Sequence, residues 1–363
     1  MSLHRMNRAV LAPPLSVVAL SLFALAATAD GQVKPSAGMM RYPDISAEKI
    51  VFSYADDLWT VDKEGGLASP LASPPGAERF PRFSPDGRRI AFVGNYEGGR
   101  DLYHISVNGG VAERSTYHPA AETLCDWHPD GKTLVYSTNG FAGLGRQTQL
   151  FTISDAEPVP QQLPVPYGSN GAVSPDGKWL AYTPYSRDTR TWKRYRGGMA
   201  SDIWLFHPED KTSKQITDFE GTDSLPMWHG KTVYYLSDAG EESRLNIWAY
   251  DTESGEREQI TTFSENDCKW PSIGPGTDGE GEIVLTNGAD LYVVTLKSNE
   301  AKTVEVTIPG DRPQLRRQKI DAADFIDGTD VSPKGKRVVV SARGELWTLP
   351  VKNGSPRNIT RTP

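Results

Sequence analysis

The chain has 363 residues, which is enough for one large domain or two smaller ones. Its formal charge is −7 and its 39 basic residues form no long run, so the composition argues against a nucleic-acid partner. Charged residues make up 23 % of the chain and hydrophobic residues 37 %, as in soluble globular proteins. The 34 glycines and 27 prolines favour turns and strands over helices.

The first 31 residues read as a signal peptide and leader. Arg5 and Arg8 precede an uncharged apolar stretch at residues 15–27, and residues 27–29 form an Ala-Thr-Ala cleavage pattern. The apolar stretch is short for a membrane span, so we expect cleavage near Ala29 rather than an uncleaved anchor. This predicts an exported protein of the periplasm or cell envelope, with no membrane contact beyond the export signal.

A turn phrase recurs along the rest of the chain. Ser-Pro-Asp-Gly at residues 84–87 returns with small changes at residues 128–131, 174–177 and 332–335. Proline pre-sets φ in such a phrase, aspartate bonds its own backbone, and glycine accepts a positive φ. The phrase therefore predicts a hairpin turn between two strands, and we interpret its serine as a turn residue and not as a nucleophile.

A second pattern recurs at a spacing similar to that of these turns. It consists of a polar residue, then an apolar residue, then an aromatic residue. The aromatic members are spaced 44 to 55 residues apart and are Trp59, Tyr103, Phe151, Trp204, Trp248, Tyr292 and Trp347. A period of this length with several short strands per unit is typical of a β-propeller. One four-stranded sheet cannot bury both faces alone, so we expect the aromatic residues to pack between sheets arranged around an axis.

The repeats predict the domain organisation. Six units fit within residues 39–308, a segment with two prolines and several arginines follows at residues 309–318, and a seventh unit occupies residues 319–363. We therefore predict an all-β fold: a six-bladed β-propeller of four-stranded antiparallel blades, a linker, and the first blade of a second, seven-bladed propeller. The linker disfavours the alternative of one seven-bladed ring, and we expect the chain to be a truncated piece of a longer protein.

The reactive residue types form no recognisable site. Cys125 and Cys268 lie far apart in the sequence and could pair in an oxidising compartment, although we favour two free thiols. We find no closely spaced metal-ligand pair and no G-x-S-x-G nucleophile motif. The sequence therefore predicts no metal, no cofactor and no catalytic residue within this chain.

One loop stands out as a candidate site. Residues 187–199 read RDTRTWKRYRGGM and account for the longest spacing among the six units. The candidate residues are Arg190, Trp192, Lys193, Arg194, Tyr195 and Arg196. Arginine offers a two-pronged donor for carboxylates, and aromatic rings make contacts that tolerate many side chains. Because loops on rigid scaffolds often carry function, we predict a substrate-path loop or a docking loop for another domain, with a solvated hairpin as the alternative.

Two segments carry a resemblance to a known family. The pattern RYPDI…IVF…DDLW within residues 41–59 and the phrase WKRYRGG at residues 192–198, with the count of six units plus one, resemble the N-terminal part of the tricorn protease family. The resemblance covers nearly all of residues 39–363. It implies a large serine protease that degrades short peptides, in which two propellers, a PDZ domain and catalytic domains follow one another.

The resemblance also implies a role for this part of the protein. The propeller would gate, select or channel peptides or unfolded polypeptide, and it would dock further C-terminal domains of a protein that forms a homo-oligomer. The family's catalytic serine and histidine lie beyond Pro363, so we expect no activity from this chain alone. The family is usually cytoplasmic, and here we favour the export signal.

Two alternative functions remain open at this point. One is a stand-alone periplasmic propeller of the Tol type, which would bind other envelope proteins. The other is the gating propeller of a prolyl-oligopeptidase-like α/β-hydrolase peptidase. Both families share the Ser-Pro-Asp-Gly repeat, so the repeat by itself does not separate them from the tricorn reading.

Overall fold

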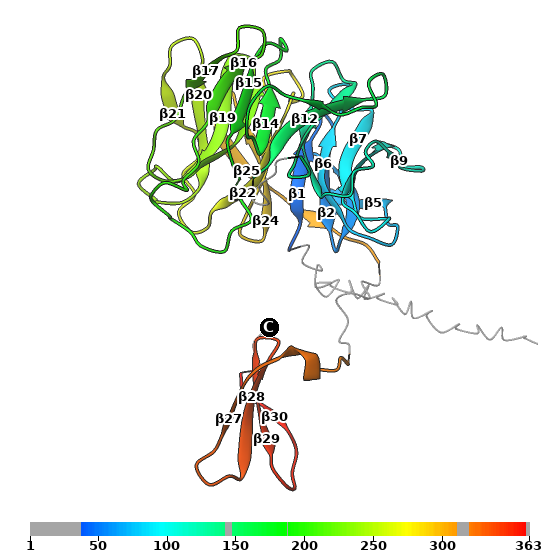
Figure 1. Cartoon of the computed structure of the whole chain (residues 1–363), viewed down its shortest axis with the longest axis vertical. Helices are drawn as coiled ribbons and strands as arrows, with labels where there is room; N and C mark the ends of the chain where they lie inside the picture. Colours follow the sequence, from blue (N-terminus) through cyan, green and yellow to red (C-terminus); the bar gives the residue numbers. More distant parts are fainter. Residues whose placement is uncertain (1–37, 142–146, 187, 311–318, 361–363) are drawn as a thin grey trace, which may run out of the picture. The chain divides into compact units, whose positions relative to one another are not determined.

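A computed structural model describes residues 38–141, 147–186, 188–310 and 319–360. The chain divides into two compact units, Met1–Pro309 and Gly310–Pro363. Within the described residues, six four-stranded antiparallel sheets follow one another in the first unit and one more lies in the second (Figure 1). We number these sheets 1 to 7 in chain order. The prediction of an all-β chain built from four-stranded antiparallel sheets is confirmed.

The strands of sheets 1 to 3 are β1 (Arg41–Ile45), β2 (Lys49–Tyr54), β3 (Asp57–Asp62) and β5 (Ser69–Ala72); β6 (Glu78–Phe83), β7 (Arg89–Gly94), β8 (Asp101–Ser106) and β9 (Glu113–Arg114); β10 (Glu122–Trp127), β11 (Thr133–Thr138), β12 (Gln149–Ser154) and β13 (Gln161–Gln162). Those of sheets 4 to 6 are β14 (Asn170–Val173), β15 (Leu180–Thr183), β16 (Trp204–His207) and β17 (Thr212–Gln215); β18 (Asp223–His229), β19 (Thr232–Ser237), β20 (Asn246–Asp251) and β21 (Arg257–Gln259); β22 (Cys268–Gly274), β23 (Glu282–Asn287), β24 (Asp290–Thr295) and β25 (Glu300–Val304).

The recurring turn joins the first and second strands of a sheet, as the sequence predicts. In sheet 2, Ser84 Oγ donates to Asp86 Oδ1 over 2.6 Å, and the Arg89 N–H donates to Ser84 Oγ over 3.0 Å. The hydrogen bond from Ser84 lowers the pKa of Asp86. Gly87 closes the turn at a φ of 68°, in the left-handed region that glycine enters at little cost. The Ser84 hydroxyl is therefore engaged in hydrogen bonds within the turn.

A threonine recurs after the fourth strand of sheets 2, 4, 5 and 7, where it follows Ser115 in sheet 2 and an isoleucine in the other three. Its hydroxyl oxygen accepts the backbone N–H of the apolar residue that precedes the repeat's aromatic residue. The pairs are Leu102 with Thr116 at 2.8 Å, Ile203 with Thr217 at 2.8 Å, Ile247 with Thr261 at 2.9 Å and Leu346 with Thr360 at 3.0 Å. Each bond extends the pairing between the third and fourth strands by one side-chain contact.

The hydrophobic core lies between consecutive sheets. Leu102 of sheet 2 packs with Leu134 and Phe151 of sheet 3, and Ile203 of sheet 4 packs with Val233 of sheet 5. The aromatic residues of the repeat lie in or against these clusters throughout the first unit. The predicted packing of these aromatic residues between sheets is confirmed there.

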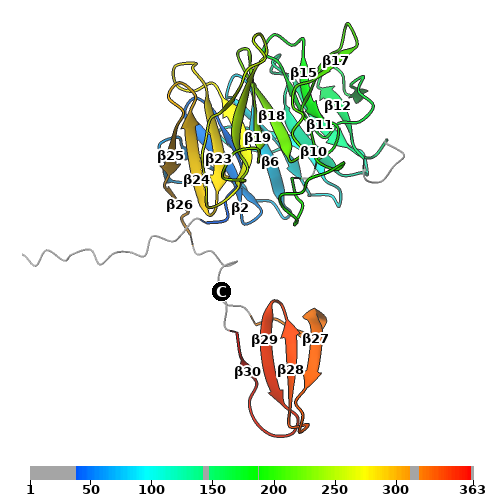
Figure 2. The same cartoon turned by 90° about the vertical axis from the view of Figure 1, so that its left-hand side faces the viewer.

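The two ends of the first unit meet. β26 (Val306–Thr307) pairs in parallel with β4 (Gly66–Leu67), and the Gly66 N–H donates to the Glu305 carbonyl over 2.8 Å. One core cluster joins Phe52 of sheet 1 to Leu291 of sheet 6. Figures 1 and 2 show the gold strands of sheet 6 beside the blue strands of sheet 1. The last sheet of the first unit therefore covers a face of the first sheet.

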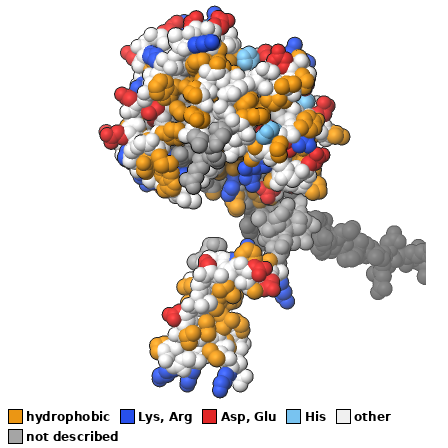
Figure 3. All heavy atoms as spheres, viewed as in Figure 1, with side chains coloured by type: hydrophobic (Ala, Val, Ile, Leu, Met, Phe, Trp, Pro, Cys, Tyr) orange, Lys and Arg blue, Asp and Glu red, His pale blue; other side chains and the backbone are white. Residues whose placement is uncertain are grey.

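The second unit presents a different surface. A turn of 3-10 helix, η2 (Ala323–Phe325), precedes sheet 7, whose strands are β27 (Ile326–Val331), β28 (Arg337–Ala342), β29 (Glu345–Pro350) and β30 (Arg357–Asn358). Val331 is 57 % exposed and Trp347 37 % exposed. Figure 3 shows hydrophobic side chains over the visible face of this sheet. Among the described residues, these apolar side chains of sheet 7 are therefore more exposed than their counterparts in the first unit.

Two further expectations concern the signal peptide and the cysteines. The predicted signal peptide lies within residues 1–37, outside the described ranges. Across the residues that are described, no helix combines the length and the apolar character that crossing a membrane requires. Cys125 and Cys268 are free thiols, as we favoured from the sequence.

Candidate functional site

A cavity of about 400 Å³ lies where the first strands of sheets 1 to 6 end. Its lining draws on all six sheets and includes Asp44, Phe83, Asp126, Val173, Trp228 and Ile273, with Pro85, Pro129, Pro175 and Pro275 from the adjoining turns. A smaller cavity of about 60 Å³ shares Asp126 and Ile273 with it and reaches Phe80 and Arg82. We call the two together the axial cavity. Because six strands converge on it, the packing of the sheets decides which side chains meet there.

The axial cavity holds charged groups. Asp44 Oδ2 accepts the Phe83 N–H over 2.5 Å and Asp44 Oδ1 accepts the Ser272 hydroxyl. Arg82 donates from Nε to the Cys125 carbonyl over 3.1 Å. Burial raises the pKa of Asp44, and it raises that of Asp126 to about 6, in both cases against the lowering effect of the nearby Arg82 guanidinium. A cation and two carboxyl groups therefore lie together in the cavity.

Four of the strands that line the axial cavity share an unusual backbone feature. Tyr42, Phe80, Leu225 and Trp270 have φ values of 52°, 53°, 52° and 47°, and each precedes a proline. The strand register shifts at each of these positions, which marks a bulge with one extra residue. Bulky residues rarely adopt a positive φ, so the surrounding packing must hold them there.

The bulges bring aromatic rings together at the start of the lining strands. The Tyr42 ring lies 4.2 Å from that of Phe80 and 4.8 Å from that of Trp270, so sheets 1, 2 and 6 meet through these side chains. Sequence reasoning missed this cluster. The signal was present as an aromatic residue or leucine before proline in RYPD, RFPR, SLPM and KWPS.

Three basic side chains of the predicted loop form ion pairs with carboxylates of the same chain. Lys193 Nζ lies 2.8 Å from Asp267 Oδ2, and Arg194 Nη2 lies 3.5 Å from Asp267 Oδ1. Arg196 Nη1 donates to Asp238 Oδ2 over 2.9 Å. The side chains of Asp267 and Asp238 are only 5 % and 4 % exposed. The loop from sheet 4 is thus held over the ends of sheets 5 and 6 by ion pairs with buried acceptors.

The aromatic members of the loop face one another. Arg190 stacks over the Trp192 ring at 4.7 Å and donates to the Thr222 hydroxyl. The rings of Trp192 and Tyr195 meet edge to face at 5.0 Å, and Trp192 stays 39 % exposed. The structure therefore brings the six predicted residues together in one ordered surface, separate from the residues that line the axial cavity.

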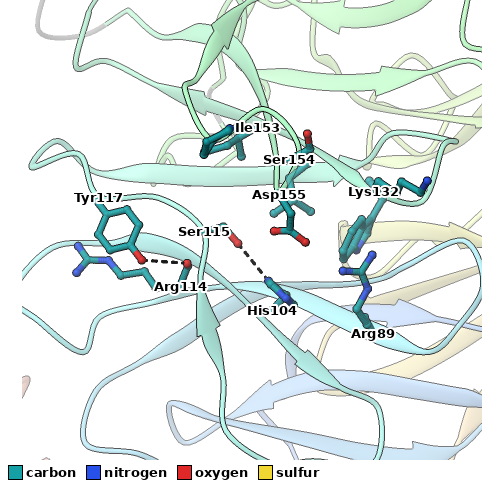
Figure 4. A pocket seen from close by; sticks show the side chains of 12 residues that line it. Arg89, His104, Arg114, Ser115, Tyr117, Lys132, Ile153, Ser154 and Asp155 are labelled. Atoms are coloured by element: carbon teal, nitrogen blue, oxygen red, sulfur yellow. Dashed lines mark hydrogen bonds between the residues drawn. The ribbon is translucent and has the colours of Figure 1, made fainter.

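A third hollow, of about 240 Å³, lies between sheets 2 and 3 (Figure 4). Within it Ser115 Oγ lies 3.2 Å from His104 Nδ1, and His104 Nε2 lies 3.7 Å from Glu113 Oε2. The arrangement has the residue types of a Ser-His-acid triad. Glu113 is 79 % exposed, however, whereas the acid of a working triad is buried and holds the imidazole firmly. We therefore do not assign Ser115 as a nucleophile.

Residues 37–300 match the family model described as the tricorn protease N-terminal beta propeller domain. The chain belongs to the tricorn protease family. The matched residues contain the first five sheets, the first three strands of sheet 6, the axial cavity and the loop, whereas most of β25 and all of sheet 7 lie outside them. The tricorn assignment therefore applies to the part of the chain where the candidate sites lie.

Relatives and solved structures agree with the tricorn match. The chain is 24 % identical over 310 residues to the tricorn protease homolog of Saccharolobus solfataricus, covering 85 % of this chain and 28 % of the relative. It is 26 % identical over 339 residues to tricorn protease homolog 1 of Streptomyces coelicolor, covering 92 % and 31 %. The crystal structure of the tricorn protease superposes with a TM-score of 0.66 at 22 % identity, covering 90 % and 32 %. The chain thus spans about a third of these proteins.

Proposed function

We propose that the chain is the N-terminal propeller portion of a tricorn-like serine protease that degrades peptides, and that this portion gates, selects or channels the peptide substrate. The axial cavity carries the proposal, because strands of all six sheets line it and it holds an arginine and two carboxyl groups. Polar groups inside an otherwise rigid cavity are typical of ligand-binding sites. Cleavage itself we assign to domains beyond this chain.

We further propose that residues 39–308 form a closed six-bladed propeller. The parallel pairing of β26 with β4 and the core shared by sheets 1 and 6 support closure. Residues 309–318 would be the linker, and residues 319–363 would open a second propeller. The exposed apolar side chains of sheet 7, such as Val331, support a second propeller because further blades would cover them.

For the loop we propose docking of another domain of the same protein, with contact to passing peptide as a second use. Its cations already pair with Asp238 and Asp267, so the free part of its surface is Trp192 together with the exposed Met199. Apolar side chains rimmed by charges suit a protein contact. Homo-oligomer formation by the full-length protein, and export to the periplasm or cell envelope after cleavage near Ala29, remain proposals from the sequence.

The gating proposal predicts that filling the axial cavity slows peptide degradation. Val173→Trp, in the full-length protease, places a large ring where Val173 lines the cavity. We expect kcat/KM for peptides of ten or so residues to fall several-fold, since access is narrowed and the catalytic domains are unchanged. Val111→Trp, at a site that is exposed on the surface, is the matched control. Equal rates for both variants and the parent protein would reject the gating role.

A further inference from the structure

One backbone contact repeats between consecutive sheets of the first unit. A backbone N–H at or just before the first strand of one sheet donates to the carbonyl that precedes the polar residue of the repeat in the preceding sheet. The donors and acceptors are Glu78 with Asp56 at 2.8 Å, Glu122 with Arg100 at 3.1 Å, Gly168 with Thr148 at 3.0 Å, Asp223 with Ser201 at 2.9 Å and Cys268 with Leu245 at 2.8 Å. Each bond brings the donor residue close to that polar residue of the neighbouring sheet.

Acidic residues occupy both positions at three of these five interfaces and neither position at the other two. The acidic pairs are Glu78 with Asp57, Glu122 with Asp101 and Asp223 with Asp202, whereas Gly168 meets Gln149 and Cys268 meets Asn246. Two ionised carboxyl groups at one buried interface repel each other, and a proton bound to one of them removes the repulsion. The pattern therefore indicates interfaces at which a carboxyl group keeps its proton.

The interface between sheets 2 and 3 buries both members of its carboxyl pair. Asp101 is 0 % exposed and Glu122 is 1 % exposed. The Thr116 hydroxyl donates to Glu122 Oε2, and Arg114 Nη2 lies 2.9 Å from Asp101 Oδ2. Glu122 Oε1 and Asp101 Oδ1 have no hydrogen-bond partner among the described residues. A protonated carboxyl group is a donor, so one proton between these two oxygens would satisfy both.

The charges around the pair compensate one carboxylate. The titratable and charged groups that face the pair from the strands packed around it are Arg114, Tyr103 and Tyr136. Arg114 also pairs with the exposed Glu97, so it compensates at most one buried carboxylate. Burial raises the pKa of both tyrosines, which therefore carry no charge at neutral pH. Burial, with a smaller contribution from Asp101, raises the pKa of Glu122 to about 7.

We propose that Glu122 and Asp101 share one proton, and that this proton is a latch between sheets 2 and 3 that is released as the pH rises above neutrality. With the proton in place, Glu122 Oε1 donates to Asp101. Without it, two buried carboxylates repel each other, so the start of β10 separates from β8. Because β10 continues to Asp126 and Trp127, the latch controls how firmly one wall of the axial cavity is held.

The sign of the pH effect follows from where the proton is bound more tightly. In the closed interface the pKa of Glu122 is about 7, whereas in an opened interface Glu122 is solvated and its pKa returns to 4.5. The stabilisation by the latch is therefore complete below pH 4.5 and is lost as the pH rises through 7. Between pH 6 and pH 8.5, the equilibrium constant for opening should rise about tenfold.

The first test measures amide hydrogen exchange of the intact chain at pH 6 and pH 8.5, with each rate divided by its intrinsic value at that pH. We expect the protected amides of β10 to exchange about tenfold faster at pH 8.5, because local opening becomes more frequent. β22 is the internal control, since it begins at Cys268, which faces Asn246 and whose thiol pKa is raised by burial to about 12. An unchanged rate in β10, or an equal increase in β22, would overturn the proposal.

The second test assigns the latch to Glu122. The amide group of Glu122→Gln can donate to Asp101 at every pH, so the corrected exchange of β10 should be the same at pH 6 and pH 8.5. Glu97→Gln is the matched control, because it removes an exposed carboxylate from the same arginine, Arg114, and should keep the tenfold change. If Glu122→Gln also kept the tenfold change, Glu122 would not be the group that holds the proton.

Infrared spectroscopy observes the proton directly, since a protonated carboxyl group absorbs apart from ionised carboxylates. We expect the carboxylic acid band at pH 6 to be weaker in Glu122→Gln than in the parent chain and unchanged in Glu97→Gln. A band of equal strength in Glu122→Gln would show that Glu122 is ionised at pH 6 and would refute the shared proton. None of these measurements uses a peptide, so their failure leaves the gating function standing.

Discussion

At the scale of single residues, buried carboxyl groups are a recurrent feature of the first unit. Glu78, Glu122 and Asp223 are buried at the starts of their strands. Burial raises the pKa of each to about 7. Glu78 Oε2 accepts the Leu58 N–H over 3.0 Å, which ties sheet 2 to sheet 1. These side chains connect sheets, and they also make the stability of the protein depend on pH.

Glu122 allows the sign of that dependence to be worked out. Its pKa is about 7 in the folded protein against 4.5 when solvated, so the folded state holds the proton more tightly. The stabilisation from this proton is complete below pH 4.5 and is lost as the pH rises through 7, by at most roughly 3 kcal/mol. We expect Glu122→Gln to be less sensitive to pH between 5 and 8, as measured by the midpoint of urea unfolding.

Glu209→Gln provides the control, because Glu209 is exposed and its charge is solvated in both states. It should follow the parent protein at every pH. If Glu122→Gln also lost stability between pH 5 and pH 8 as steeply as the parent, another group would be responsible for the dependence.

At the scale of elements, the short pairing of β4 with β26 joins the ends of the first unit. Gly65, just before β4, has a φ of 93°, and a Cβ atom built there would lie 2.5 Å from the Glu305 carbonyl oxygen. Backbone meets backbone at this point, so a side chain cannot be accommodated by a rotamer change. The contact between the first and last sheets therefore depends on a glycine.

Gly65→Ala should destabilise the first unit by roughly 1–3 kcal/mol, from backbone strain together with the displaced strand. Gly98→Ala is the matched control, because Gly98 has a similar φ of 88° with no atom within 4 Å of an added Cβ. Chemical denaturation of both variants separates the two causes. Equal losses would show that the β4–β26 contact contributes nothing beyond the strain.

The elements also show how far the sequence could predict the sheets. The turn and the threonine each lie within one repeat and make their defining contact inside their own sheet, as Ser84 does with Asp86 and Thr116 with Leu102. Short-range contacts of this kind can be predicted from spacing alone. The bulges at Tyr42 and Trp270 were missed because they depend on the partner sheets as well as on the residues themselves.

At the scale of the whole molecule, the two units differ in how much of their apolar surface is buried. The first has a core between every pair of consecutive sheets, whereas sheet 7 leaves Ile326 and Val331 about half exposed. A single sheet with an uncovered apolar face adds little to its own stability. The stability of the first unit should therefore not depend on the second.

A variant that ends at Pro309 tests this independence. We expect it to keep the melting temperature of the main transition in scanning calorimetry, because the six sheets and the β4–β26 pairing are retained. It should also bind less of an apolar fluorescent dye, since the exposed face of sheet 7 is gone. A lower melting temperature would show that the second unit supports the first.

The sequence by itself determined the sheets, the turns and the family resemblance, because every repeat encodes its own hairpins over a span of a few residues. Only the tertiary structure decided which side chains share the axial cavity. Arg82 and Asp126 belong to different sheets, and their meeting depends on how sheets pack around an axis. It likewise decided that Lys193 and Arg196 of the predicted loop pair with Asp267 and Asp238, since carboxylates from later sheets reach that loop only after the sheets have assembled.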